Sequence, residues 1–255
     1  MPTATLTGLP TFRSYTERDG AALRLYCFPP SGFGPGFFAD WAGHLPSTVD
    51  LFAAYLPGRG SRRDEPAITD ARALIKGIAD ALATDDRPFA FFGHSLGALV
   101  AFETARRLRR LGQRMPELLA LSAFPAPHDG QLQGEVASWL LGGIERFSTL
   151  VGAPARRFAE DPDLLAATCR PLVADALLVL QYEHHEEAPL DTPLALYGGQ
   201  SDPIAPAHRL AAWNDLVTLP ATPHLFPGGH QYPRHAAAPV AARLLADLRA
   251  VTHVV

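Results

Sequence analysis

The chain has 255 residues, 47% of them hydrophobic, with 22 basic and 26 acidic side chains that give a net charge of −4. This length and apolar content predict one domain over residues 1–255, and a domain of this size needs no partner chain to fold, so we expect a monomer. The charge balance excludes a global basic footprint for nucleic acid, two cysteines are too few for a disulfide framework, and no apolar run approaches a membrane span.

The first half of the chain alternates predicted strands and helices. Residues 1–20 are polar, rich in Pro and Thr, and show no signal-peptide pattern, so we expect a loose lead-in and a cytoplasmic protein. Apolar runs predict strands at 23–28 and 49–56, and each run ends in a loop rich in Pro and Gly. We expect helices at 37–45 and 68–83, the second because its apolar residues recur at helical spacing.

The stretch 88–110 is the most informative part of the chain. An apolar run leads into GHSLG at 93–97, and apolar residues at helical spacing follow. G-x-S-x-G between a strand and a helix predicts a nucleophile elbow, a strained turn that lifts the serine hydroxyl above the sheet. Glycines suit this turn because a Cβ at either position would collide with neighbouring backbone, and the helix N-terminus adds positive partial charge beneath Ser95.

The second half of the chain contains a long interruption of the alternation. After a predicted strand at 117–124, residues 126–189 show helical patterns and no strand pattern, which is long for a connection within an α/β unit. Because the segment follows the strand after the elbow, we interpret it as a helical lid over an active site rather than as padding. Predicted strands at 193–197 and 224–226 and a helix at 239–251 resume the alternation, which indicates a mostly parallel sheet with helices on both faces.

The chain offers Ser95 a base and an acid in the expected order. A serine hydroxyl becomes a good nucleophile only when a base takes its proton and a third group orients that base. On such sheets the acid and then the histidine follow the serine, on loops at the carboxyl ends of strands. Asp202 and His230 each come soon after a predicted strand, behind two glycines, whereas Asp175 lies in the insertion and Asp215 follows a helix. The sequence therefore predicts the triad Ser95, Asp202 and His230.

An acyl-transfer site also needs hydrogen-bond donors for the oxyanion. We expect one donor in the backbone N–H of Leu96, directly after the nucleophile, and the second at Ser31 or Gly32, in the loop after the strand at 23–28. The sequence has no HExxH, CxxC or Walker pattern, so it supports neither a metal nor a nucleotide cofactor.

Five segments, in this order and spacing, resemble the type II thioesterases of polyketide and nonribosomal peptide assembly lines. They are CFPPSGFGPGFFADW, LPGRGSRRDEP, FFGHSLGALVAFE, YGGQSDPIAP and FPGGHQYP. The resemblance implies an α/β-hydrolase fold with a helical lid. It matches Ser95, Asp202 and His230 to the family's catalytic triad, and it matches Leu96 and Ser31 to the pair of residues that form the family's oxyanion hole.

The resemblance also implies a substrate and a partner. The expected reaction is hydrolysis of acyl or aminoacyl thioesters from the phosphopantetheine arm of acyl or peptidyl carrier proteins, which removes stalled or aberrant chains. The family usually has two glycines where this chain has Gly32-Phe33, so we expect these two residues to border and narrow the substrate channel. Carrier proteins are generally acidic, so the basic positions Arg59, Arg62 and Arg63 offer one candidate docking patch.

Two other functions stay open on the sequence. A general carboxylesterase would use the same triad, and a non-catalytic protein would keep the hydrolase fold to bind a ligand or a partner. The complete set of serine, acid and histidine favours an enzyme over a binding protein. The loop at 29–36 and the turn at 57–59 favour a thioesterase over an esterase by resemblance alone.

Overall fold

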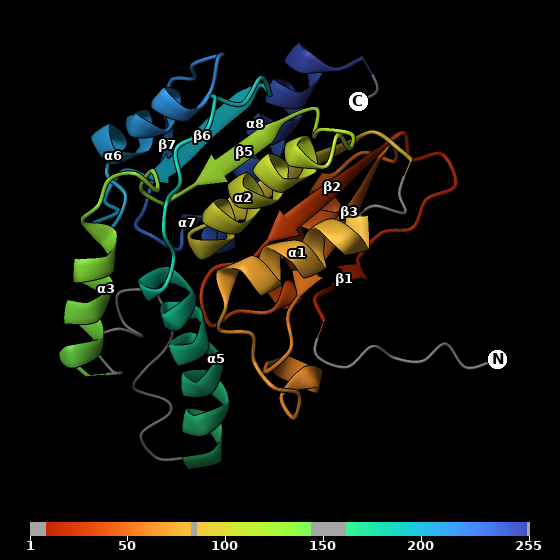
Figure 1. Ribbon diagram of the computed structural model, residues 1–255. Helices are drawn as coiled ribbons and strands as arrows, with labels where there is room; N and C mark the ends of the chain where they lie inside the picture. Colours follow the sequence, from red (N-terminus) through yellow and green to blue (C-terminus); the bar gives the residue numbers. More distant parts are fainter. Residues whose placement is uncertain (1–8, 83–85, 144–161, 254–255) are drawn as a thin grey trace.

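The computed structural model describes residues 9–82, 86–143 and 162–253, and these residues form one sheet of seven strands in the order β1-β3-β2-β4-β5-β6-β7 (Figure 1). All neighbouring strands run parallel except β1, which is antiparallel to β3. The strands are β1 (Thr11–Ser14), β2 (Leu23–Phe28), β3 (Val49–Tyr55), β4 (Phe89–His94), β5 (Leu119–Ser122), β6 (Leu194–Gly199) and β7 (His224–Phe226). The predicted mostly parallel sheet is confirmed.

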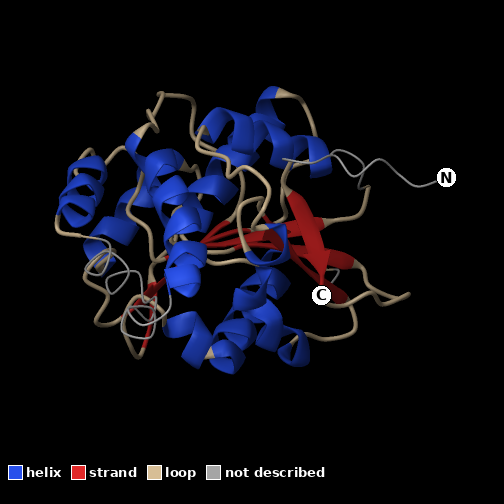
Figure 2. Cartoon of the chain, turned by 90° about the horizontal axis from the view of Figure 1, so that it is seen from below, coloured by secondary structure: helices blue, strands red, loops and turns tan. Residues whose placement is uncertain are grey.

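Helices cover both faces of the sheet, so that the strands form the middle layer in Figure 2. Helices α1 and α2 pack on one face, and η1 and α8 pack on the other, while apolar residues of α3 and α5 join the core on the side of α1 and α2. The α-helices are α1 (Ala71–Leu82), α2 (Leu96–Arg110), α3 (Leu132–Leu141), α5 (Pro162–Leu180), α6 (Ala207–Ala211), α7 (Tyr232–His235) and α8 (Ala237–Val251). The 3₁₀ helices are η1 (Pro35–His44), η2 (Gly60–Arg62) and η4 (Ala212–Leu216).

The central strands are apolar along their whole length because both of their faces are covered. Successive side chains of a strand point to opposite faces, and in β4 Phe89 and Phe91 join the core under α1 and α2. Ala90 and Phe92 join the core under η1 and α8. A strand buried on both sides needs an uninterrupted apolar run, which is why its sequence signal is strong.

Two local expectations need correction. The loose lead-in predicted for residues 1–20 is wrong for Thr11–Ser14, which form β1 and pair with β3 from Thr11 opposite Tyr55. This edge strand has only exposed or half-buried side chains, so it leaves little apolar pattern in the sequence. The helix expected at 37–45 is present, but it winds as the 3₁₀ helix η1 from Pro35.

The insertion at 126–189 contributes helices α3 and α5, which contact each other beyond the arrowheads of the parallel strands in Figure 1. Within its described parts, 126–143 and 162–189, the insertion has no strand. Two apolar residues of the insertion, Ile144 and Phe147, lie outside the described residues.

The strand order reverses its direction between β2 and β4. The chain steps from β2 outward to β3 and then crosses back to place β4 on the other side of β2. The loops after β2 and β4 therefore leave the sheet in opposite directions, and the crevice between them is where open α/β sheets bind ligands.

Candidate active site

Ser95 stands on a strained turn between β4 and α2. Its φ of 54° and ψ of −127° lie where residues other than glycine rarely occur. A Cβ at Gly93 would lie 2.2 Å from the carbonyl oxygen of Gly97, and a Cβ at Gly97 would lie 2.0 Å from that of Phe28. The backbone approaches are therefore possible only with glycine, and the predicted elbow is present at the end of β4.

Asp202 and His230 lie on neighbouring loops after β6 and β7 and meet at Ser95. Nδ1 of His230 is 2.9 Å from Oδ2 of Asp202, and Nε2 of His230 is 3.0 Å from Oγ of Ser95. All three side chains are buried. The structure thus brings together the three residues that the sequence singled out, although Ser95 lies more than a hundred positions before the other two.

The environment of Asp202 keeps it ionised. Burial by itself would raise the pKa of the Asp202 carboxyl, but the hydrogen bond and charge of His230, with the N–H groups of Ile204 and Ala205, outweigh burial and lower that pKa. A carboxylate only accepts hydrogen bonds, so Nδ1 of His230 donates to it. In the neutral ring Nε2 is then free of a proton and can accept the hydroxyl proton of Ser95.

His94, inside the elbow, forms a second buried network that sequence reasoning missed. Its Nδ1 is 2.7 Å from Oγ of Ser122, which is 2.6 Å from the hydroxyl of Tyr232, two residues after His230. Burial and the neighbouring His230 hold the pKa of His94 well below its usual value, so the ring is neutral. The signal in the sequence was a hydroxyl residue, Ser122, in the otherwise apolar run at 118–124.

The loop after β2 turns tightly beside Ser95. The N–H of Phe33 donates to the carbonyl of Pro30 at 3.1 Å, and Gly32 has a φ of 79°. This combination describes a type II turn, in which the third residue requires positive φ. Ser31 is buried and faces the same small space as Ser95, whereas the N–H of Gly32 donates to Oδ2 of Asp175 at 2.7 Å. Of the two candidate second donors, only Ser31 adjoins the serine.

The space over Ser95 is small and apolar. Its volume is about 20 Å³, and besides Ser31 and Ser95 it is lined by Phe124, Leu132, Val136, Trp139, Ala176, Val179 and Ile204. Most of these residues belong to α3 and α5, so the insertion roofs the serine. A space of this size holds no more than one or two water molecules.

Gly32 and Phe33 do not line this space. Phe33 is half-buried, its ring centroid lies 5.5 Å from that of Phe37, and the Arg234 guanidinium lies 5.4 Å above the Phe33 ring. The two residues expected to border the channel therefore belong to the Ser31 turn but do not line the space over Ser95.

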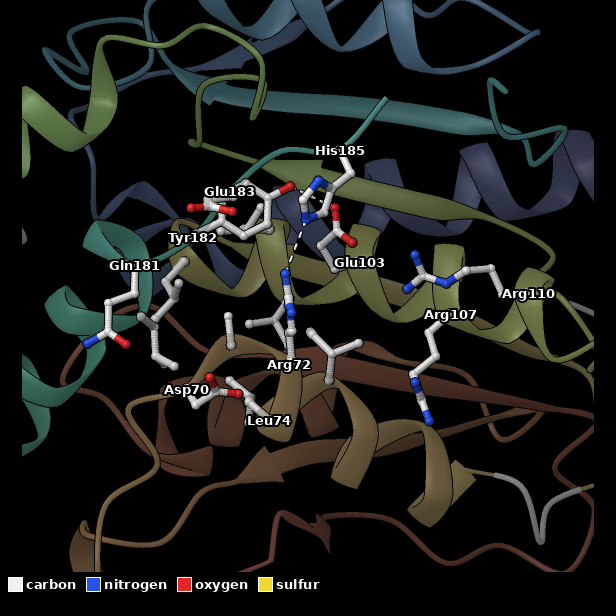
Figure 3. Close-up of a pocket in the computed structure, with 16 residues that line it drawn as sticks. Asp70, Arg72, Leu74, Glu103, Arg107, Arg110, Gln181, Tyr182, Glu183 and His185 are labelled. Carbon is white, nitrogen blue, oxygen red and sulfur yellow. Dashed lines mark hydrogen bonds between the residues drawn. The ribbon is translucent and has the colours of Figure 1, made fainter. Parts of the chain in front are cut away.

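A larger cavity of about 460 Å³ runs along α2, between α1 and the chain that follows α5 (Figure 3). It is lined both by apolar side chains, such as Leu74, Leu96 and Leu99, and by ionisable ones, such as the labelled Glu103, Arg107 and His185. Ser95 does not line this cavity. The first turn of α2 thus lies between this larger cavity and the small space over Ser95.

The expected docking patch needs correction at Arg59. This side chain is 4% exposed and forms an ion pair with Asp175 of α5, so it cannot reach an external partner. Asp175 is bonded to Arg59 and to the N–H of Gly32, whereas His230 is bonded to Asp202, so Asp175 is not the third group for His230. Arg63, by contrast, is exposed, and Arg62 pairs with Glu65.

Within the described ranges 9–82, 86–143 and 162–253, no group of three His, Cys, Asp or Glu side chains is gathered to hold a metal ion. In the same ranges, no helix combines the length and the apolarity that crossing a membrane requires.

The parallel sheet, the serine elbow and the order of the three polar residues define an α/β hydrolase. A family model described as Thioesterase domain matches residues 23–248, and the chain belongs to that family. The expected fold and the expected thioester hydrolase activity are confirmed at this level.

Several known proteins are similar to this chain. It is 34% identical to the linear gramicidin dehydrogenase LgrE of Brevibacillus parabrevis over 82% of this chain and 81% of that protein. It is 32% identical to the thioesterase PikA5 of Streptomyces venezuelae over 86% of this chain and 79% of that protein. The solved type II thioesterase BorB from the borrelidin biosynthetic cluster superposes with a TM-score of 0.77 at 27% identity, covering 93% of this chain and 97% of BorB.

Proposed function

We propose that this enzyme hydrolyses acyl or aminoacyl thioesters held on the phosphopantetheine arm of a carrier protein, with Ser95 as nucleophile, His230 as general base and Asp202 as the group that orients His230. The hydrogen-bonded row from Asp202 through His230 to Ser95 carries this proposal. The match to the thioesterase family and the similarity to BorB, a type II thioesterase from a biosynthetic cluster, support the choice of thioesters over other esters.

The first half of the reaction transfers the acyl group to the serine. Oγ of Ser95 attacks the thioester carbon while its proton passes to Nε2 of His230, and a tetrahedral oxyanion forms. The oxyanion then collapses, the bond between carbon and sulfur breaks, and the His230 proton passes to the departing thiol. The products of this half are free phosphopantetheinyl thiol on the carrier protein and an acyl ester on Ser95.

The second half releases the acyl group to water. A water molecule attacks the ester carbon and gives a proton to Nε2 of His230. The bond between the carbon and Oγ of Ser95 breaks, and the proton of His230 returns to Oγ. The carboxylic acid leaves and the serine is restored, so that the whole cycle consumes one water per thioester and needs no cofactor.

We assign the oxyanion hole to the backbone N–H groups of Leu96 and Ser31. Leu96 is the first residue of α2, so its N–H adds to the positive end of that helix. Ser31 borders the same space as Ser95. The N–H of Gly32 is already bonded to Asp175, which supports Ser31 as the second donor.

We further propose that residues 1–255 form one domain and that the insertion at 126–189 acts as its lid. The roof that α3 and α5 provide over Ser95 supports this role. The pantetheine arm would pass beside Gly32 and Phe33, next to the Ser31 turn. Replacing Phe33 with Ala should widen that passage and change the kcat/KM values for different acyl groups by different factors.

The role in the cell follows from the relatives. BorB comes from a gene cluster for borrelidin and is named a type II thioesterase, which supports an editing role that clears stalled or aberrant chains from a polyketide or nonribosomal peptide assembly line. We therefore propose a cytoplasmic monomer whose partner is an acyl or peptidyl carrier protein.

A panel of carrier proteins loaded with different acyl groups tests the proposal. Release of the free thiol, followed by mass spectrometry, should fall by about 10⁴- to 10⁶-fold in Ser95→Ala while the melting temperature stays near that of the unsubstituted enzyme. Near-normal release by Ser95→Ala would refute the assignment of Ser95. Faster turnover of p-nitrophenyl esters than of every carrier-bound thioester would instead indicate a general carboxylesterase.

A further inference from the structure

A buried ion pair connects the insertion to the body of the enzyme close to Ser95. Arg59, in the loop after β3, and Asp175, in α5, are 116 residues apart in the chain. Their side chains meet at two points, with Nη2 2.7 Å from Oδ1 and Nη1 2.9 Å from Oδ2. Both are almost wholly buried, and removing two charges from water is costly. A pair of this kind contributes little to stability by itself.

The same pair holds the turn that carries Ser31. Oδ2 of Asp175 accepts the N–H of Gly32 at 2.7 Å, and Nη1 of Arg59 donates to the carbonyl of Phe33 at 3.1 Å. Leu172, one helical turn before Asp175, lies over the same place, since a Cβ on Gly32 would be 3.2 Å from its Cδ1. Helix α5 therefore contacts this turn through both a polar and an apolar side chain.

The contact with Gly32 selects one of two conformations of the turn. Type I and type II turns differ by a flip of the central peptide, here the peptide between Ser31 and Gly32. The flip reverses the direction of the Gly32 N–H and changes the backbone angles on either side. The observed φ of 79° is that of a type II turn, and only this orientation directs the N–H to Asp175.

We propose that Asp175 is a positioning residue for the oxyanion hole: by accepting the Gly32 N–H it holds the turn in place, and with it the Ser31 N–H that bonds the reacting carbonyl. Arg59 orients the Asp175 carboxylate and holds the far end of the turn. Because Asp175 belongs to α5, the oxyanion hole is complete only when this lid helix is packed in the observed position. The proposal rests on the proposed role of Ser31.

Two double variants isolate the hydrogen bond from the ion pair. Arg59→Met with Asp175→Leu removes both charges and the acceptor for Gly32, without leaving a charge buried alone. Arg59→Met with Asp175→Asn removes the charges but keeps a carbonyl acceptor of nearly the same shape. We expect the first double variant to lose about 10- to 100-fold in kcat with little change in KM, and the second to recover most of that loss.

Binding of hexylboronic acid gives a readout that a purely structural role would not change. Oγ of Ser95 adds to boron, the serine proton passes to His230, and one boronate oxygen occupies the oxyanion hole. The affinity for hexylboronic acid should fall in the Leu double variant, Arg59→Met with Asp175→Leu, by about the factor lost in kcat. The affinity for the carboxylic acid product should stay constant. Equal kcat and equal boronate affinity in the two folded double variants would overturn the proposal, as would a change confined to KM.

Asp129→Asn is the matched control. Asp129 also ties the insertion to the body, through its ion pair with Arg209 of α6, but it does not touch the Ser31 turn. Its kcat and boronate affinity should match those of the unsubstituted enzyme. If the control lost activity as the Leu double variant does, general loosening of the insertion would be the cause and the proposal would be wrong.

Gly32→Ala tests the turn with the ion pair in place, and it serves if the Leu double variant does not fold. Alanine is strained at a φ of 79°, and its Cβ would press on Leu172, so the turn should leave its type II form. A folded Gly32→Ala enzyme with normal kcat would overturn the proposal. The failure of Ser95→Ala to abolish activity would overturn the proposed function itself, which separates the two tests.

Discussion

The two sides of the small space over Ser95 are built in different ways. Below it, Ser95, Asp202 and His230 follow the carboxyl ends of β4, β6 and β7 and are joined by hydrogen bonds of 2.9 and 3.0 Å. Above it, α3 and α5 present apolar side chains such as Val136 and Trp139, which pack without directional bonds to the serine. The lower side fixes the geometry of the reaction, and the upper side fixes the room that the substrate has.

This difference explains why the site is both well formed and nearly full. Hydrogen bonds and strand ends define positions to a fraction of an ångström, whereas apolar contacts between helices can shift at low cost. A space of about 20 Å³ does not hold an acyl chain. We therefore expect substrate binding to displace side chains of the roof and to leave the three polar groups where they are.

The largest effect should come from the lower side. Asp202→Asn keeps the shape of the site but no longer favours the ring form of His230 that accepts the serine proton, so kcat should fall about 10⁴-fold. Asp215→Asn is the control, because Asp215 is exposed and lies near His128 rather than His230. Steady-state kinetics on one carrier-bound thioester measures both. An Asp202→Asn enzyme within tenfold of the unsubstituted one would remove Asp202 from the triad.

A change in the roof should alter selectivity rather than chemistry. Val136 is buried and faces the space over Ser95, so Val136→Phe should reduce that space further. We expect kcat/KM for long acyl chains to fall by about tenfold or more relative to acetyl, the scale on which pockets discriminate a few methylene groups. Leu141→Phe is the control on the same helix, since Leu141 is 89% exposed. An equal change for every acyl length would show that the roof does not select the substrate.

The lower side of the space, with Ser95, Asp202 and His230, was largely predictable from the sequence, because the patterns that reveal it are local. Strands buried on both faces need continuous apolar runs, and the elbow needs glycines at 93 and 97, so both leave unmistakable patterns over a few residues. Asp202 and His230 were found because each follows a strand closely. The edge strand β1 left no such pattern, because it draws its stability from pairing with β3.

The connections between the two sides were not predictable. Arg59 and Asp175 are distant in the chain, and each alone has the appearance of a solvated charge. Only the packing of α5 on the loop after β3 makes them a buried pair. His94, Ser122 and Tyr232 likewise form a network that no short motif encodes. Sequence patterns locate the elements, but contacts between distant elements decide which polar residues are buried.

Changes in the buried network of His94, Ser122 and Tyr232 should have a moderate effect on stability and on kcat. Tyr232→Phe removes the hydroxyl that contacts Ser122 and should lower the free energy of unfolding by about 1 kcal/mol. Because Tyr232 closes the loop that holds His230, kcat should also fall a few-fold. Ser122→Ala should act in the same way, and the double variant should lose less than the sum of the two single changes. Additive losses would show that the two hydroxyls act separately.

The smallest expected effect concerns the outer attachment of the insertion, where Glu187 forms ion pairs with Arg106, Arg109 and Arg110. Burial by itself would raise the pKa of Glu187, but its hydrogen bonds to arginine and their charges outweigh burial and hold that pKa below its ordinary value of 4.5. The folded chain therefore binds the proton less readily than the unfolded chain does. The stabilisation is fully present above about pH 5 and is lost as the pH falls through the lowered pKa.

Glu187→Gln should accordingly lower the free energy of unfolding by about 0.5–1 kcal/mol at pH 7 and by progressively less at pH 4 and pH 3, the range in which carboxyl groups take up protons. Urea unfolding of both proteins across that range measures the difference. Activity at pH 7 should stay unchanged, because Glu187 touches α2 near its C-terminal end and not the turn at Ser95. A difference that stays constant down to pH 3 would mean that Glu187 stabilises the fold by packing and not by charge. An accompanying loss of kcat at pH 7 would mean that the ion pairs of Glu187 also position the helices that roof Ser95. The far end of α2 would then belong with the adjustable upper side of the space.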